Sequence, residues 1–153
     1  ALFAGIYYWF PKMTGKKMSE MLGKMHFWPS LIFMNGIFMP MFIQGLAGVS
    51  RRLADGGQSY AHASGVLEWN EFMSISAFCL GIAQIPFIVN ILMSLFSGAK
   101  ASRNPWDSTT IEWAAPSPPV GHGNFDGPIN VYHTAYEYSV PDDKKDFKPQ
   151  FEN

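Results

Sequence analysis

The sequence predicts an all-α integral membrane protein that ends in a polar tail. Two segments carry no Asp, Glu, Lys or Arg: 26 residues from Met25 to Ser50 and 28 residues from Phe72 to Ala99. A helix needs ~20 predominantly apolar residues to cross a bilayer, so each segment is long enough to span. The formal net charge is only −1, which excludes a basic nucleic-acid binder and an acidic disordered chain.

Proline and polar residues divide the chain further. The apolar stretch "ALFAGIYYWF" stops at Pro11, so we expect residues 1–10 to be the last turns of a spanning helix that begins outside this chain, in a larger protein. The expected order after it is a cytoplasmic-side loop at 11–20, a transmembrane helix at 21–48, an outer-side loop at 49–66, a second transmembrane helix at 67–97 and a polar tail at 98–153. The proline-rich tail is expected to lie extended on a partner surface.

Several residues inside the spans carry a structural expectation. Pro29, Pro40 and Pro86 should kink their helices without breaking them, because neighbouring helices satisfy the freed carbonyls. A lone Cys79 in an apolar run should simply pack. The spans also contain amides, which we expect to bridge neighbouring helices: Asn35, Asn70, Gln84 and Asn90.

Lys and Arg counts predict the sidedness of the chain. The first loop and the start of the tail, which must share a side, together carry six basic residues, whereas the middle loop carries only Arg51 and Arg52. The positive-inside rule therefore places the first loop and the tail in the cytoplasm, or in the matrix of a mitochondrion. The arginine pair then lies on the outer side, which the rule disfavours.

Two explanations compete for the arginine pair. Arg at the end of a membrane helix commonly extends to lipid headgroups. However, adjacent helical residues point about 100° apart, so both cannot face lipid equally well. The alternative is a bound anion, because the planar guanidinium group matches a carboxylate or a phosphate with two parallel hydrogen bonds.

Four ordered segments now carry a family resemblance: "WFPKMTGKKMSEMLGKMHFW", "FMNGIFMPMFIQGLAGVSRRL", "EWNEFMSISAF" and "NPWDSTTIEWAAPSPP". Together they resemble the C-terminal part of the catalytic subunit I of heme-copper oxygen reductases of the cytochrome c oxidase type. The family order is a tenth helix closing on W-F-P, a K-x-H-F start of the eleventh helix, a G-x-x-G-x-x-R-R exit, a twelfth helix and a T-x-E-W motif before prolines. The resemblance fails only over the last ~25 residues.

The resemblance implies a 12-helix subunit with two hemes, one low-spin and one high-spin, and copper. Its iron and copper ligands would lie outside this segment, which therefore holds no catalytic residue of its own. The implied partners are the remainder of subunit I, oxidase subunits II and III, cytochrome c and membrane lipid, with no nucleic acid. In the family, Arg51 and Arg52 would be directed at the heme propionates, and Phe38, Met34 and Met41 would lie near a porphyrin wall, where packing against another helix is the rival interpretation.

The resemblance also suggests roles for three further residues. Asp55 stands where some members place a carboxylate of an outer-side calcium or sodium site, against the alternative of a solvated loop carboxylate. His26 and Glu20 stand near positions discussed for a proton route in mitochondrial members. Because Ile37 and Leu80 replace hydroxyl residues of that route, interfacial anchoring of His26 is the competing interpretation.

The function implied by the resemblance is a segment of a proton-pumping terminal oxidase that passes electrons from cytochrome c to oxygen. A quinol-oxidising relative of the same fold is one alternative, and a non-catalytic membrane hairpin that serves assembly is another. The expected location is the inner (cytoplasmic) membrane of a bacterium rather than a mitochondrion, with a multi-pass topology and a cytoplasmic C-terminus.

Overall fold

The computed structural model describes residues 1–125, 127–135, 144 and 148–152, and it divides the chain into two compact units. One unit contains residues 19–92, and the other contains residues 1–18 and 93–153. The helices and strands in chain order are α1 (Leu2–Thr14), α2 (Glu20–Leu46), α3 (Trp69–Ile82), α4 (Ile85–Ser97), β1 (Asn130–Val131) and β2 (Phe151–Glu152), with 3₁₀ turns at Ala61–Val66 and Ile111–Ala114.

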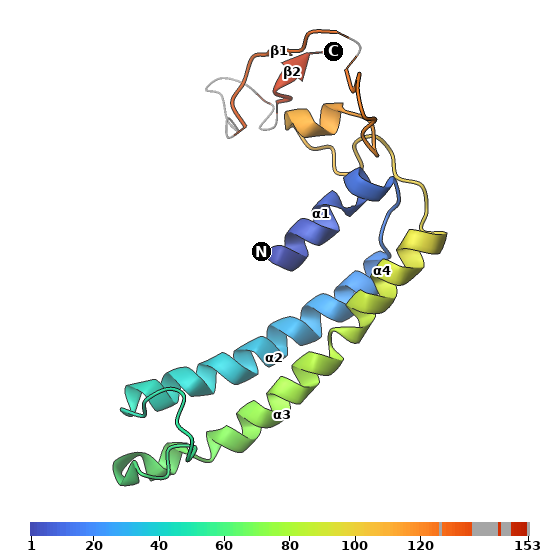
Figure 1. Ribbon diagram of the computed structural model, residues 1–153. Coiled ribbons are helices and arrows are strands. Elements are labelled where there is room, and N and C mark those ends of the chain that lie inside the picture. The colour runs from blue at the N-terminus through green and yellow to red at the C-terminus, as the bar shows by residue number, and fades with distance from the viewer. Residues whose placement is uncertain (126, 136–143, 145–147, 153) are drawn as a thin grey trace. The chain divides into compact units, whose positions relative to one another are not determined.

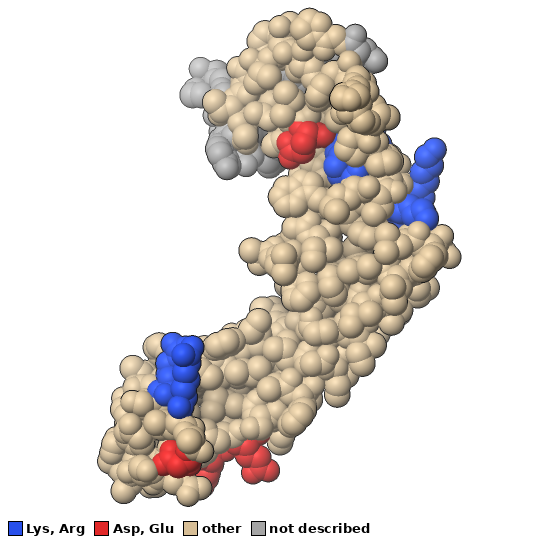
Figure 2. Space-filling view, viewed as in Figure 1, with Lys and Arg blue, Asp and Glu red and all other residues tan. Residues whose placement is uncertain are grey.

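The unit of residues 19–92 contains an antiparallel hairpin of α2 and α3 (Figure 1). The segments Glu20–Leu46 and Trp69–Ser97 are both long and apolar enough to cross a membrane. Large side chains along them are exposed in this chain, including Phe27, Ile32 and Phe78 at 55%, 61% and 77% of their surface. A helix that is apolar all round must be covered by lipid or by other protein. Figure 2 accordingly shows charged atoms at the loop end of the hairpin and tan atoms along its visible sides.

Helix α2 begins where its sequence provides a cap. Ser19 has extended backbone angles, and its hydroxyl accepts a hydrogen bond from the Leu22 amide at 3.5 Å. Glu20 lies in the first turn, where a negative charge interacts favourably with the helix dipole. The helix then runs unbroken through Pro29 and Pro40, as expected for prolines inside a membrane helix.

Helix α2 and helix α3 pack closely at Gly36. A Cβ atom added to Gly36 would lie 2.7 Å from Oγ of Ser76, which is a collision. Ser76 itself is only 3% exposed. The absence of a side chain at Gly36 therefore allows the two backbones to pack closely, as small residues do at membrane helix interfaces.

The second span differs from the expected single helix over 67–97, because a turn at residues 83–84 separates α3 from α4. Pro86 has no N–H to donate to the Ile82 carbonyl, and its ring disfavours a regular helix there. The Gln84 side chain crosses at this turn: its Nε2 donates to Oγ of Ser30 at 3.2 Å, and its Oε1 lies 3.1 Å from Nε2 of His26. Gln84 thus bridges α2 and the α3–α4 turn.

Amides elsewhere in the spans follow the expectation unevenly. Asn90, fully buried, donates to the Ser19 carbonyl at 2.9 Å and accepts from the Ser19 amide at 2.8 Å, so it bridges helices. Asn35 instead donates to Leu31 of its own helix at 2.8 Å. The bridging role expected for Asn35 stays a prediction, because its amide keeps an oxygen and a second N–H beyond this bond.

In the other unit, α1 extends past the expected end at residue 10. Pro11 lies inside the helix, which continues to Thr14 and ends at Gly15 in a left-handed conformation. The Gly15 amide donates to the Pro11 carbonyl at 2.8 Å, and the Thr14 hydroxyl donates to the Phe10 carbonyl at 2.7 Å. These bonds satisfy carbonyl groups of the last turn, so the helix continues for one more turn beyond Pro11 before the glycine cap ends it.

The start of the tail packs on α1. Trp113, at 1% exposure, meets the Tyr8 ring edge-on at 5.2 Å between centroids and has the Lys12 ammonium 4.9 Å from its own ring centroid. Lys12 is also buried, and its Nζ donates to the Ala115 carbonyl at 2.8 Å. The tail was expected to be extended, but in its described part it forms a 3₁₀ turn on this chain's own first helix and the β1–β2 pair, in which Asn130 is opposite Glu152.

Candidate functional site

The stretch "GLAGVSRR" folds as the end of α2 and the start of the loop that carries the arginines. Gly48 has φ of 85°, its amide donates to the Gly45 carbonyl at 3.0 Å, and the Val49 amide donates to the Gln44 carbonyl at 3.0 Å. This pair of bonds is a Schellman motif, which requires a left-handed residue that glycine adopts without strain. Gly48, the second glycine of "GLAG", therefore ends the helix and turns the chain toward Arg51.

Gly48→Ala is expected to destabilise the loop by about 1 kcal/mol or more, because alanine is strained at positive φ. Its Cβ would also lie 3.2 Å from Nε2 of His62. The measurement is the apparent unfolding temperature of the intact membrane protein. Gly45→Ala is the matched control, since its Cβ would meet nothing within 4 Å and the residue is helical; equal loss of stability in both variants would contradict the prediction.

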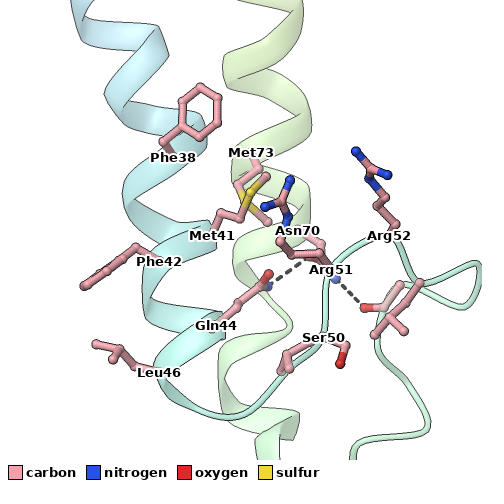
Figure 3. Close-up of a pocket in the computed structure, with 14 residues that line it drawn as sticks. Phe38, Met41, Phe42, Gln44, Leu46, Ser50, Arg51, Arg52, Asn70 and Met73 are labelled. Atoms are coloured by element: carbon pink, nitrogen blue, oxygen red, sulfur yellow. Dashed lines mark hydrogen bonds between the residues drawn. The ribbon is translucent and has the colours of Figure 1, made fainter.

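Arg51 and Arg52 lie at an open cavity of about 800 Å³ at the loop end of the hairpin. Figure 3 shows both guanidinium groups rising from the loop toward the level of Met41 and Met73, with Arg51 nearer to these side chains and Arg52 farther from α2. The cavity is lined by Phe38, Met41, Phe42, Gln44, Gly45, Leu46, Val49, Ser50, Arg51, Arg52, Leu53, Gly56, Asn70 and Met73. The structure thus brings four of the predicted residues together, namely the two arginines, Phe38 and Met41.

Met34 does not line this cavity. It lies one helical turn before Phe38 on α2 and is 46% exposed. Phe38 and Met41 are also exposed, at 56% and 38%. Two apolar side chains therefore form an uncovered wall beside the two cations.

The arginine pair has no acidic partner among residues 1–125, 127–135, 144 and 148–152. Within these described residues, the structure shows an ion pair between Lys24 and Glu20 at 2.7 Å, in the first turns of α2. Both arginines are exposed, and Arg52 has a left-handed φ of 59°. Two adjacent guanidinium groups beside an apolar wall offer paired donors suited to an anion that is attached to an apolar body, such as the carboxylates of a porphyrin. The residues present therefore fit heme propionates.

Asp55 is engaged by its own loop. Its Oδ1 accepts from the Gly57 amide at 3.0 Å, and its Oδ2 accepts from the Ser59 amide at 3.0 Å and from the Ser59 hydroxyl at 2.5 Å. These bonds, the hydroxyl first, lower the pKa of Asp55 below its ordinary value. The ionised carboxylate therefore stabilises this turn at neutral pH, and its contribution is lost as the pH falls through the lowered pKa.

The remaining titratable candidates lie apart from the arginines. In the described part of the chain, no three His, Cys, Asp or Glu side chains gather as a metal ligand set, and the ion site suggested for Asp55 stays a prediction. His26 is 3% exposed and contacts Gln84 and the Phe87 ring, whose centroid lies 5.0 Å away. Its role in a proton route likewise stays a prediction.

Sequence reasoning missed Gln44 as a residue of this site. Gln44 is 7% exposed, and its Nε2 donates to the Val66 carbonyl and to Oδ1 of Asn70, both at 2.9 Å. Asn70 was expected to bridge helices and does so. The available signal for Gln44 was an amide, one of two in the uncharged segment, that stands one position before the G-x-x-G-x-x-R-R motif.

Comparison with known proteins places the chain among oxidase sequences. Residues 1–111 match the family model described as Cytochrome C and Quinol oxidase polypeptide I. The alternative cytochrome c oxidase subunit 1 of Bradyrhizobium diazoefficiens is 41% identical over 150 residues, which are 97% of this chain and 25% of the relative. The cytochrome c oxidase subunit 1 of Synechocystis is 41% identical over 140 residues, 92% of this chain and 24% of that protein.

The cytochrome c oxidase subunit 1 of Thermostichus vulcanus is 43% identical over 119 residues, which are 78% of this chain and 20% of the relative. The chain thus spans about a quarter of the length of the first two relatives. Similarity was expected to fail over the last ~25 residues, but the Bradyrhizobium protein aligns with 97% of the chain. That expectation is wrong, because the alignment with this relative extends into the tail.

Proposed function

Because the chain belongs to the family of cytochrome c and quinol oxidase polypeptide I, we propose that it is the C-terminal part of the catalytic subunit of a proton-pumping terminal oxidase. The whole enzyme would pass electrons from cytochrome c through hemes to oxygen. The partners of this segment would be the remainder of subunit I, subunits II and III, cytochrome c and the surrounding lipid. The helices α1, α2 and α3–α4 would correspond to the end of the tenth helix, the eleventh helix and the twelfth helix of a 12-helix bundle.

The observation that carries the proposal is the pair of guanidinium groups without acidic partners in the described residues, beside the apolar side chains of Phe38 and Met41. Arg51 and Arg52 would donate hydrogen bonds to heme propionates, while Phe38 and Met41 would exclude water from the porphyrin edge. When bound, the hemes, one low-spin and one high-spin, would supply electron transfer, and copper would take part in the reduction of oxygen. The iron and copper ligands would come from the remainder of the subunit.

The charge of the arginines would influence heme redox chemistry. Reduction adds an electron to the heme, so a fixed positive charge nearby favours the reduced form and raises the midpoint potential. At an effective dielectric of 20, the attraction between a guanidinium group and a propionate 4 Å away is about 4 kcal/mol before screening. Arg51 and Arg52 would thereby hold the propionates ionised and take part in proton uptake around them.

The proposed topology follows from the basic residues. The positive-inside rule supports an outer-side position for the arginine loop and a cytoplasmic position for the tail. The bacterial relatives support the inner membrane of a bacterium as the location. Met34, one turn before Phe38, would join the same apolar wall once a partner helix packs against Met34. Asp55 would remain available to an outer-side cation.

The test of the proposed function is a reduced-minus-oxidised absorption spectrum of the complex purified from its membrane through a tag on this chain. We expect heme bands together with oxygen consumption driven by reduced cytochrome c. A complex that contains hemes but oxidises only quinol would overturn the assignment of cytochrome c as donor. A preparation without heme bands would overturn the oxidase assignment itself.

A further inference from the structure

Two buried amides connect the helices to the loop that carries the arginines. Gln44 in the last turn of α2 uses Nε2 twice, toward the Val66 carbonyl and toward Oδ1 of Asn70, each at 2.9 Å. Asn70 in the first turn of α3 then donates from Nδ2 to the Gly56 carbonyl at 2.8 Å. Figure 3 shows the hydrogen bond between Gln44 and Asn70 beside the arginines.

The direction of each bond fixes the orientation of both side chains. A side-chain amide has one acceptor oxygen and two donor hydrogens. Gln44 has only its NH₂ group facing two oxygens, and Asn70 must present its oxygen to Gln44 and its NH₂ group to Gly56. Flipping either amide would place two oxygens or two NH₂ groups in contact, so the pair has one favourable arrangement.

The bonds reach the loop on both sides of Arg51 and Arg52. Before the arginines, the Schellman motif closes residues 44–49, because the Val49 amide donates to the backbone carbonyl of Gln44. After them, Asn70 donates to the Gly56 carbonyl, and Asp55 accepts a hydrogen bond from the adjoining Gly57 amide. The backbone that carries the arginines is therefore fixed at Gly48 and again at Gly56.

Other polar bridges in the hairpin do not have this relation to the arginines. The Gln84 bridge to Ser30 and the Asn90 bridge to Ser19 lie outside the arginine cavity, whereas Gln44, Gly56 and Asn70 line it together with Arg51 and Arg52. An amide pair that only joined two helices would not need to reach a loop carbonyl. The contact with Gly56 distinguishes this pair.

We propose that Gln44 and Asn70 form an amide clamp that positions Arg51, and with it Arg52, for their anionic ligand. This inference rests on the proposed contact between the arginines and heme propionates. Gln44 and Asn70 are positioning residues, because they act on the loop backbone and not on the ligand. Their removal should leave the charges in place but loosen the geometry of a paired hydrogen bond, which depends on the position of the donor.

The experiment measures heme midpoint potentials by redox titration of the intact oxidase, together with bound heme content. The single variants are Gln44→Met and Asn70→Leu, and the exchanged pair Gln44→Asn with Asn70→Gln keeps both amides. Asn35→Leu is the matched control, since that amide also lies in α2 but donates to the Leu31 carbonyl of its own helix. Each clamp variant is also made in an Arg51→Met background.

We expect Gln44→Met and Asn70→Leu to lower the midpoint potential in the direction of Arg51→Met and by a smaller shift, with Asn35→Leu unchanged. The exchanged pair should recover most of the shift, and neither clamp variant should add a shift once Arg51 is gone. A shift that persists in the Arg51→Met background would overturn the clamp, because the amides would then act by another route.

Two other outcomes separate the clamp from the proposed function. If Arg51→Met lowers the potential while both clamp variants retain the wild-type value, the clamp is wrong and the propionate contact stands. If Arg51→Met itself changes nothing, the propionate contact fails first. Loss of bound heme in both single variants without recovery in the exchanged pair would also overturn the clamp, since the amides would then serve only the fold.

Discussion

Replacing Arg51 with methionine in the intact oxidase is expected to lower the midpoint potential of the nearer heme by about 70 mV. The estimate takes a unit charge about 10 Å from a redox centre at an effective dielectric of 20, which contributes about 1.7 kcal/mol for one electron. Methionine keeps an unbranched apolar side chain and removes the charge. Spectroelectrochemical titration of the purified complex measures the shift.

Arg51→Lys is the control for charge against geometry. Lysine keeps the positive charge but not the paired, planar donors, so we expect a shift smaller than that of Arg51→Met. Arg52→Met should also give a smaller shift, because Arg52 extends farther from Met41 and Met73 (Figure 3). A titration of Arg51→Met that superimposes on the wild-type curve would contradict the assignment.

Replacing Trp113 with alanine is expected to release the start of the tail from α1. Trp113 is 1% exposed and contacts both Tyr8 and Lys12, and truncating a buried Trp costs about 3–5 kcal/mol. Amide hydrogen exchange over residues 104–118 of the purified complex should therefore accelerate by about 100-fold or more if local opening governs exchange there. The hairpin residues 20–46 serve as the internal reference.

The control for the tail prediction is Tyr132→Ala. Tyr132 is 58% exposed, and its backbone amide, which donates to the Gln150 carbonyl at 2.9 Å, is kept in the variant. We expect unchanged exchange at 104–118 in this variant. Equal acceleration in both variants would show that tail order depends on something other than the Trp113 contacts with α1.

Much of the helical arrangement could be predicted from the sequence, because span length and absence of charge are local properties. The uncharged runs after Lys24 and after Glu71 predict two apolar spans, and both helices are present. Their ends were harder to predict. One turn of α1 forms beyond Pro11, whereas the span that contains Pro86 divides at residues 83–84. The effect of a proline on its helix therefore depends on the tertiary surroundings.

The tail shows a second limit of sequence reasoning. Its prolines indicate an irregular chain, and the T-x-E-W motif carries a family resemblance, but neither says where Trp113 lies. The contact with Lys12 joins residues about 100 positions apart, and a long-range contact of this kind has no periodic signal in the sequence. A buried lysine in particular is not expected from composition.

By itself, the sequence determined that the chain is a helical membrane segment and that Arg51 and Arg52 stand at the end of a span. These conclusions need only local hydrophobicity, charge and backbone preference. Only the tertiary structure decided that Gln44 and Asn70 hold the arginine loop from two helices, and that Phe38 and Met41 share a cavity with the arginines while Met34 does not. The physical reason is that an amide is uncommitted until folding brings a partner to it.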